Sequence, residues 1–163
     1  TGASTLAAAS AGAHVNHLDA SKASENWARQ NLELSGMGDR PVRWIVEDAM
    51  KYMQKEHKRG IKYDGIIMDP PSFGRGPKGK VGQIANKLSE LMEACKNILN
   101  DKPAFLLFTT HSPGFPSLSL ENMIRTYLPS TQNGHFETGE MFIPDTSSGL
   151  NLPNRFFCRW VSN

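Results

Sequence analysis

The chain has 163 residues, which is enough for one domain with a sizeable hydrophobic core. Hydrophobic residues make up 39% and charged residues 21%, a balance typical of a globular protein that argues against disorder. The net charge of +2 is too small to indicate nucleic-acid binding by itself, so any such indication must come from local clusters. No apolar run reaches the roughly 18 residues that a membrane-spanning helix needs.

In chain order, the sequence predicts a helix at residues 3–11, a strand at 15–18, a helix at 21–35, a strand at 42–46, a helix at 49–58, a strand at 63–68, a helix at 84–99, a strand at 104–109, a helix at 117–128, and strands near 135–141 and 156–161. A connection rich in Pro, Gly and Ser, residues 144–154, separates the last two strands. Gly12, Gly36 and Gly60 each lie where a helix is expected to end.

This alternation predicts an α/β fold with a Rossmann-like, doubly wound and mostly parallel sheet that ends in an antiparallel hairpin. The chain begins Thr1-Gly2, without an initiator Met and inside an expected turn. We therefore expect one catalytic domain over residues 1–163, as a fragment of a longer protein whose first strand precedes Thr1. No signal peptide is visible, so we expect a cytoplasmic location, or an organelle if a transit peptide precedes the fragment.

Gly2, Asp19 and Asp48 lie at the expected carboxyl ends of strands, where such sheets bind ligands. Gly2 lets a backbone approach a ligand closely, although it can also be a simple turn glycine. Asp19 can accept hydrogen bonds from ribose hydroxyls, and Asp48 from an adenine amino group. Both acids can instead cap the helices that follow them. Together, Gly2, Asp19 and Asp48 are compatible with binding of either NAD or S-adenosylmethionine.

The motif Asp-Pro-Pro-Ser-Phe at residues 69–73 favours S-adenosylmethionine. A methyltransferase acting on a planar nitrogen needs to hold the N–H groups and localise the lone pair of that nitrogen. The Asp69 carboxylate and the Pro70 carbonyl can accept those hydrogen bonds, and Phe73 can stack on the ring. The simpler alternative is that the motif only forms a turn at the end of a strand. A hydride-transferring enzyme has no evident need for this motif.

The chain resembles the class I S-adenosylmethionine-dependent methyltransferases, and within them the branch of large-subunit ribosomal RNA methyltransferases. The resemblance extends over nearly the whole chain. It is carried by residues 12–22, 27–31, 34–36, 40–49 and 69–79.

The resemblance implies roles for individual residues. Gly2 would belong to the cofactor loop, Asp19 with Ala20 would hold the ribose, and Asp48 with Ala49 would hold the adenine. The segment 69–73 would form the acceptor side, with Asp69 also close to the cofactor and Pro71 close to the substrate.

One departure from related enzymes narrows the chemistry. Relatives that make 5-methylcytosine carry a cysteine after the fifth strand, because carbon methylation needs a thiolate that adds to the ring. The matching segment here reads Thr-Thr-His-Ser at residues 109–112. Cys95 lies in an expected helix and Cys158 in the last expected strand, so neither is placed at a ligand-facing strand end. The lack of a cysteine at these strand ends favours a base nitrogen over a ring carbon as the atom that is methylated.

Three further residues are candidates for substrate contact. His111 follows an expected strand and can move a proton or touch the acceptor, or it can be a polar loop residue. Arg75 and Lys78 lie in a glycine-rich loop that can hold RNA phosphates, or is an ordinary solvated loop.

We therefore expect S-adenosylmethionine-dependent methyl transfer to a base nitrogen of RNA, with ribosomal RNA as partner and no metal or membrane. Methylation of a protein side-chain amide is an alternative, since a planar amide presents the same N–H geometry. A module that binds cofactor or RNA without catalysis is another, and an NAD dehydrogenase is the weakest.

Overall fold

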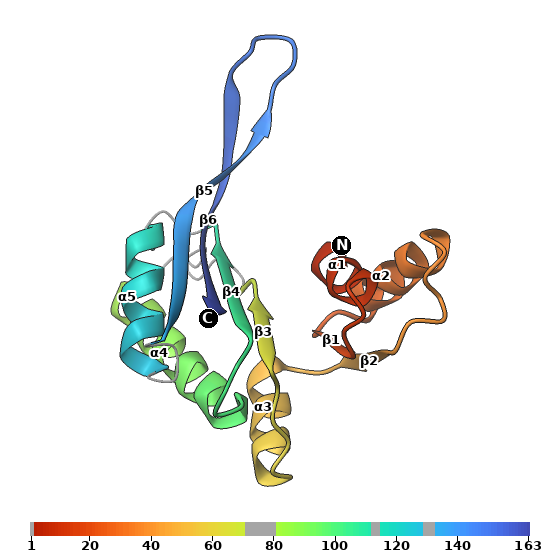
Figure 1. Cartoon of the computed structure of the whole chain (residues 1–163), viewed down its shortest axis with the longest axis vertical. Helices are drawn as coiled ribbons and strands as arrows, with labels where there is room; N and C mark the ends of the chain where they lie inside the picture. The colour runs from red at the N-terminus through yellow and green to blue at the C-terminus, as the bar shows by residue number, and fades with distance from the viewer. Residues whose placement is uncertain (1, 71–80, 112–114, 129–132) are drawn as a thin grey trace. The chain divides into compact units, whose positions relative to one another are not determined.

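The computed structural model describes residues 2–70, 81–111, 115–128 and 133–163. The chain forms two compact units, Thr1–Lys55 and Glu56–Asn163. Figure 1 shows the elements of each unit. Among the described residues, no helix is long and apolar enough to cross a membrane.

The first unit contains α1 (Ala3–Ser10), β1 (Val15–Asp19), α2 (Lys22–Leu34) and β2 (Val42–Val46), followed by the start of α3 (Ala49–Lys58). β1 and β2 pair in parallel from Val15↔Val42 to Asp19↔Val46, so their carboxyl ends lie at one edge.

Local chemistry explains where α2 begins and which face it buries. The Ser21 hydroxyl accepts a hydrogen bond from the backbone N–H of Ser24 at 3.3 Å, which caps the helix. One turn apart, Ala28 and Leu32 are buried against the rest of the unit.

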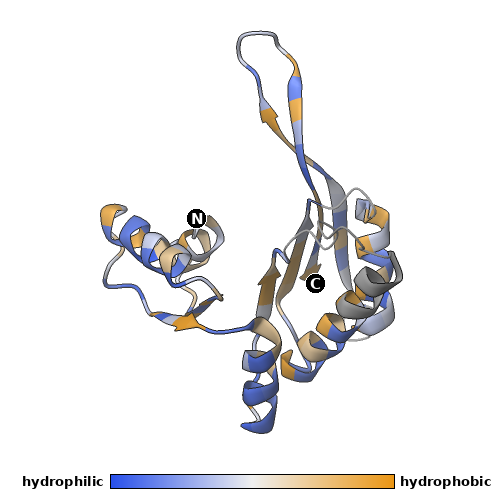
Figure 2. Ribbon diagram, turned by 180° about the vertical axis from the view of Figure 1, so that it is seen from behind, coloured by the Kyte–Doolittle hydropathy of each residue, from blue (hydrophilic) through white to orange (hydrophobic). Residues whose placement is uncertain are grey.

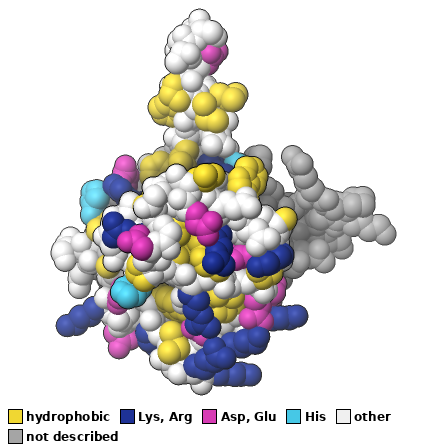
Figure 3. All heavy atoms as spheres, turned by 90° about the vertical axis from the view of Figure 1, so that its right-hand side faces the viewer, with side chains coloured by type: hydrophobic (Ala, Val, Ile, Leu, Met, Phe, Trp, Pro, Cys, Tyr) yellow, Lys and Arg dark blue, Asp and Glu magenta, His cyan; other side chains and the backbone are white. Residues whose placement is uncertain are grey.

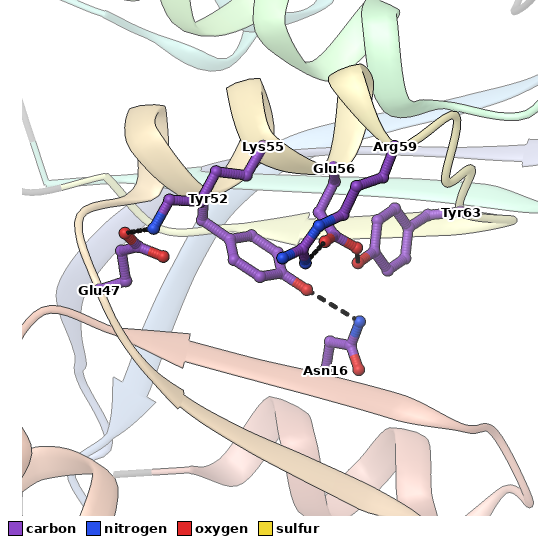
Figure 4. A network of polar contacts seen from close by, with 7 residues as sticks. All are labelled: Asn16, Glu47, Tyr52, Lys55, Glu56, Arg59 and Tyr63. Carbon is purple, nitrogen blue, oxygen red and sulfur yellow. Dashed lines mark hydrogen bonds and ion pairs between the residues drawn. The ribbon is translucent and has the colours of Figure 1, made fainter.

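Side-chain hydrogen bonds join elements of the first unit. Thr5 of α1 and the Nδ1 atom of His17 in β1 lie 2.7 Å apart. The Asn16 amide donates to the Tyr52 hydroxyl of α3 at 3.1 Å (Figure 4). The first contact places the amino-terminal turn of α1 beside the middle of β1.

The second unit is built on a four-stranded sheet in the order β3-β4-β6-β5. Its elements are β3 (Gly65–Met68), α4 (Val81–Ile98), β4 (Phe105–Thr110), α5 (Ser117–Tyr127), β5 (Gly134–Pro144) and β6 (Asn151–Ser162). β3 and β4 are parallel, whereas β6 runs antiparallel to both β4 and β5. Helices α4 and α5 contact each other and α5 packs on β5 and β6 (Figure 1).

The core of the second unit lies between this sheet and its helices. Leu106, Phe108 and Trp160 are each at most 1% exposed, and Met92 of α4 and Ile124 of α5 are fully buried. Hydrophobic residues follow one another along β3 and β4, as Figure 2 shows. β4 is the more deeply buried of the two strands, whereas Ile67 of β3 is 38% exposed.

Glu56 is a buried charge in this unit, with 1% of its surface exposed. Its two carboxylate oxygens accept hydrogen bonds from the Tyr63 hydroxyl at 2.7 Å and from Arg59 at 3.1 Å (Figure 4). Buried carboxylates are tolerated only when they are paired in this way, so these contacts are part of the fold.

The last two strands are longer than the sequence predicts. The expected connection at 144–154 is wrong in part, because β5 continues to Pro144 and β6 begins at Asn151, with an irregularity between Met141 and Phe142. Only residues 145–150 form the turn. Within it the Asp145 carboxylate accepts hydrogen bonds from Ser147 and Ser148, which lower the pKa of Asp145 to about 2.

This hairpin projects beyond the sheet (Figure 1) and carries hydrophobic side chains that face solvent (Figure 3). The exposed set consists of Met141, Phe142, Ile143, Leu150 and Leu152. A two-stranded ribbon has no core of its own, which accounts for this exposure.

The α/β class and the C-terminal antiparallel hairpin are thus confirmed. The sheet is divided into a two-stranded and a four-stranded part, and among the described residues no further strand pairs with β1 or β3. A strand before Thr1, and a single domain over the whole chain, stay predictions.

Candidate active site

The two acids predicted to hold the cofactor lie at the same edge of the first unit. Asp19 is the last residue of β1, and Asp48 follows the end of β2. One oxygen of Asp19 accepts the backbone N–H of Ser21 at 2.7 Å, and one oxygen of Asp48 accepts that of Lys51 at 3.0 Å. The capping alternative is therefore realised for Asp48, which caps α3, whereas Asp19 holds the turn before α2, whose cap is Ser21. Among the described residues, the second oxygen of each carboxylate has no hydrogen-bond partner and can accept from a ligand.

Gly2 lies at the amino-terminal end of α1, with a left-handed backbone at φ 82°. A Cβ added there would lie 2.7 Å from the Cβ of Ala28, so a glycine lets α1 approach α2 closely. No side chain caps α1, and its first turn contacts the middle of β1 through Thr5 and His17. The first backbone amides of a helix without such a cap can bind a ligand with anionic or hydroxyl groups.

Ala20 and Ala49 follow the two acids directly, and both are exposed. Neither side chain can donate or accept a hydrogen bond, so their contribution to a ligand would be contact area and backbone groups. Their small size leaves room for a flat ring beside each acid.

His17 is the titratable group nearest to this edge whose pKa is shifted. Burial lowers the pKa of its imidazole, and the carboxylates of Asp19 and Glu25 oppose that effect. Its Nε2 atom is buried without a hydrogen-bond partner among the described residues, and its ring lies 4.9 Å from that of Trp44. The neutral imidazole is therefore a packing group of the sheet.

In the second unit, Asp69 lies at the carboxyl end of β3, beside that of β4. The register Met68↔Phe108 places residue 69 next to Thr109. The Thr109 hydroxyl donates to Oδ1 of Asp69 at 2.7 Å, and the Arg155 guanidinium donates to Oδ2 at 2.5 Å. The Asp69 side chain is 46% exposed, so it is held in place while open to a substrate.

Arg155 is the site residue that the sequence reasoning missed. It is 86 residues from Asp69 and belongs to β6, which pairs with β4 through Thr110↔Phe156. Only this antiparallel pairing brings residue 155 to the end of β4. A local sequence pattern carries no such signal, since the register depends on the length of the hairpin.

His111 lies at the same end of β4 and is exposed. Its Nδ1 atom is 3.1 Å from the backbone oxygen of Asn154, the residue before Arg155. The structure therefore brings Asp69 and His111 to one end of the sheet in the second unit, as predicted. Their roles stay predictions.

Pro70 follows Asp69 and is half-buried. The other predicted acceptor-side residues lie outside the described residues: Pro71, Phe73, Arg75 and Lys78.

Both cysteines are buried in the second unit, away from these strand ends. Cys95 lies in α4, and Cys158 pairs with Phe108 in the sheet. Burial raises the pKa of each thiol to about 12, which removes the thiolate that an addition to a pyrimidine ring requires. In the described ranges, no group of three or more acidic, His or Cys residues forms a metal site.

Comparison with solved structures identifies the fold. The S-adenosylmethionine-dependent methyltransferase from Agrobacterium tumefaciens superposes with a TM-score of 0.83 and 38% identity, over 99% of this chain and 53% of that one. The chain has the fold of the S-adenosylmethionine-dependent methyltransferases. The protein SMU.776, solved with SAH (S-adenosylhomocysteine), shares this fold, with a TM-score of 0.65 and 20% identity over 96% of this chain and 42% of that one.

Curated relatives match about half of the chain. Ribosomal RNA large subunit methyltransferase K of Neisseria meningitidis is 35% identical over 79 residues, which are 48% of this chain and 22% of that protein. Ribosomal RNA large subunit methyltransferase I of Klebsiella pneumoniae is 35% identical over 82 residues, or 50% and 18%. The matches thus span about a fifth of those proteins' lengths. No protein-family model matches the chain. The resemblance to this branch of methyltransferases is confirmed.

Proposed function

We propose that the chain is the catalytic part of an S-adenosylmethionine-dependent methyltransferase whose acceptor is a base nitrogen of RNA, with ribosomal RNA as the partner. The observation that carries the proposal is the exposed Asp69 carboxylate, held at the carboxyl end of β3 and followed by Pro70. The fold and the curated relatives named above support it.

In this proposal the first unit holds the cofactor. The second carboxylate oxygen of Asp19 accepts hydrogen bonds from the ribose hydroxyls, and that of Asp48 accepts from the adenine amino group. Ala20 and Ala49 leave room beside these acids, and Gly2 keeps the first amides of α1 accessible. Each acid uses one oxygen for a local contact with a backbone N–H and offers the other to an adenosine.

Asp69 and Pro70 hold the acceptor. A carboxylate oxygen has two lone pairs, so Asp69 can accept an N–H from the acceptor in addition to its bonds with Thr109 and Arg155. The carbonyl of Pro70 accepts the second N–H of an exocyclic amino group. These hydrogen bonds orient the nitrogen lone pair, and orientation supplies most of the catalysis in such a transfer.

Bound S-adenosylmethionine would supply a methyl group on a sulfonium, whose C–S bond breaks as the N–C bond forms, leaving S-adenosylhomocysteine. The acceptor nitrogen then loses a proton to the Asp69 carboxylate, which passes it to water because the side chain is exposed. His111, at the same end of the sheet, is the second candidate for this proton. Arg75 and Lys78 would contact RNA phosphates.

Transfer of a tritiated methyl group from S-adenosylmethionine tests the proposal. The full chain is incubated with total RNA or with total protein, and label in RNA that is removed by ribonuclease is the expected result. Label in protein alone would overturn the RNA acceptor in favour of a side-chain amide. Binding of S-adenosylhomocysteine without any transfer would favour a module without catalysis.

Two variants sharpen this test. Asp69→Asn keeps the shape of the side chain but removes its charge, so we expect loss of turnover with the affinity for S-adenosylhomocysteine changed by no more than a few fold. Asp64→Asn is the matched control, because Asp64 precedes β3 and binds the Asn100 amide at the opposite end of the strand. Loss of cofactor binding with turnover retained in Asp69→Asn would contradict the assigned role.

A further inference from the structure

Both oxygens of the Asp69 carboxylate are held by side chains from two other strands. Thr109 of β4 binds Oδ1 and Arg155 of β6 binds Oδ2, and the same Arg155 nitrogen lies 3.5 Å from the Thr109 hydroxyl. We propose that Arg155 is a positioning residue, which fixes the plane of the Asp69 carboxylate for methyl transfer. This inference rests on the proposed function and adds to it a residue that the motif at 69–73 does not contain.

An exposed aspartate would otherwise turn freely, because rotation of its carboxylate is broad and only weakly restricted. Thr109 alone provides a single contact about which the group can still swing. Arg155 provides the second contact, on the other oxygen, and together they define the direction of the remaining lone pairs. The direction of the Asp69 lone pair that would accept an N–H of the methyl acceptor therefore depends on Arg155 of β6.

The contact differs from an ordinary surface ion pair. Arg159 lies on the same strand and pairs with Glu137 of β5, where its side chain is 54% exposed. The Arg155 side chain is 28% exposed and contacts two residues of the candidate site. Exposed pairs contribute about 0–1 kcal/mol to stability. Arg159 thus serves as a matched control for Arg155 in charge, strand and pairing.

The hairpin sets the position of Arg155 through the backbone. Arg155 pairs with Met141 of β5, and Asn154 before it offers its backbone oxygen to His111. Two adjacent residues of β6 thus contact the ends of β3 and β4, at the point where the hairpin leaves the sheet. This arrangement keeps the guanidinium over Asp69.

Steady-state methyl transfer by the full chain tests this role, with Arg155→Met, Arg155→Lys and Arg159→Met compared with wild type. If Arg155 orients Asp69, Arg155→Met lowers kcat by about 10- to 100-fold, since misplacement of a reacting group costs this much. The KM for RNA and the calorimetric affinity for S-adenosylhomocysteine stay within about threefold. Arg155→Lys restores part of kcat, because an ammonium keeps the charge but not the planar donor geometry. Arg159→Met behaves as wild type.

A second comparison asks whether Arg155 acts through Asp69. In single-turnover experiments at high enzyme concentration, which measure the residual methyl transfer of Asp69→Asn, adding Arg155→Met has no further effect if the carboxylate is the only route. A further loss of tenfold or more in the double variant would overturn the inference. An Arg155→Met chain with wild-type kcat would overturn it too. So would a raised KM for RNA with a weaker salt dependence, which indicates a phosphate contact. A wild-type chain that transfers no methyl group would instead overturn the proposed function and, with it, the inference.

Discussion

Because α1 approaches α2 closely at Gly2, a single methyl group added there should lower the free energy of unfolding. The effect has a backbone part and a packing part, which can be measured separately. Gly2→Ala places an alanine at φ 82°, which costs roughly 1–2 kcal/mol in the left-handed region. The new Cβ would lie 2.7 Å from the Cβ and 3.0 Å from the Cα of Ala28, and such overpacking costs about 1–3 kcal/mol. We therefore expect Gly2→Ala to lower the free energy of unfolding by roughly 2–5 kcal/mol.

Gly12 separates the two contributions. Its backbone is equally left-handed, at φ 87°, but an added Cβ meets nothing within 4 Å. Gly12→Ala should cost only the conformational part, about 1–2 kcal/mol. Adding Ala28→Gly to Gly2→Ala removes the nearest clashing atom, so the double variant should recover the packing part. Urea unfolding of the full chain, followed by circular dichroism, measures all of these changes.

Two results would refute this reasoning. Equal costs for Gly2→Ala and Gly12→Ala would mean that the space beside Ala28 does not matter. An additive double variant, without the expected coupling between positions 2 and 28, would lead to the same conclusion.

Three further predictions concern buried groups. Cys95 and Cys158, whose pKa values are raised to about 12, should resist a thiol reagent at pH 8 in the native chain and both react in guanidinium; native labelling would contradict their burial. Tyr63→Phe should lower the free energy of unfolding by about 1–3 kcal/mol, because it removes the hydroxyl that donates to the buried Glu56 carboxylate; an unchanged urea midpoint would refute this. The pKa of His17 is lowered in the folded chain, so the unfolded chain binds more protons near pH 6 and stability should fall as pH drops from 7 to 5; His17→Gln should flatten that decline, and an unchanged slope would count against it.

Elements with strong local signals were predicted almost to the residue. The strand expected at 42–46 and the helix expected at 49–58 match β2 and α3. Asp48 caps α3, and Asp19 holds the turn before the Ser21 cap of α2, so these side chains mark the boundaries. The same local chemistry places the two acids at one edge of the first unit, and their role toward a cofactor stays a prediction.

The length of the hairpin was not predictable in this way. Residues 144–154 contain Pro, Gly, Ser and Asn, a composition typical of a loop, yet Pro144 and residues 151–153 pair across the two strands. Cross-strand pairing is a non-local interaction, and it overrides local preference in β5 and β6. Because the position of Arg155 depends on this pairing, the contact with Asp69 was missed as well.

The position of Asp69 at a strand end could be predicted, because it follows from the apolar run before it. The partners of Asp69 required knowledge of strand order. β4 is adjacent to β3 in a parallel sheet, whereas β6 reaches β4 only because the chain turns back at residues 145–150.

The order of the strands also bears on how the second unit folds as it is synthesised. β6 is the last strand in the chain, yet it lies between β4 and β5 in the sheet. The ribosome therefore releases β4 and β5 before the strand that joins them exists. We expect the first unit, whose strands follow one another closely, to assemble earlier. The second unit and its Asp69 site must wait until residues 151–162 have emerged, which leaves the hydrophobic faces of β4 and α5 available to chaperones until that moment.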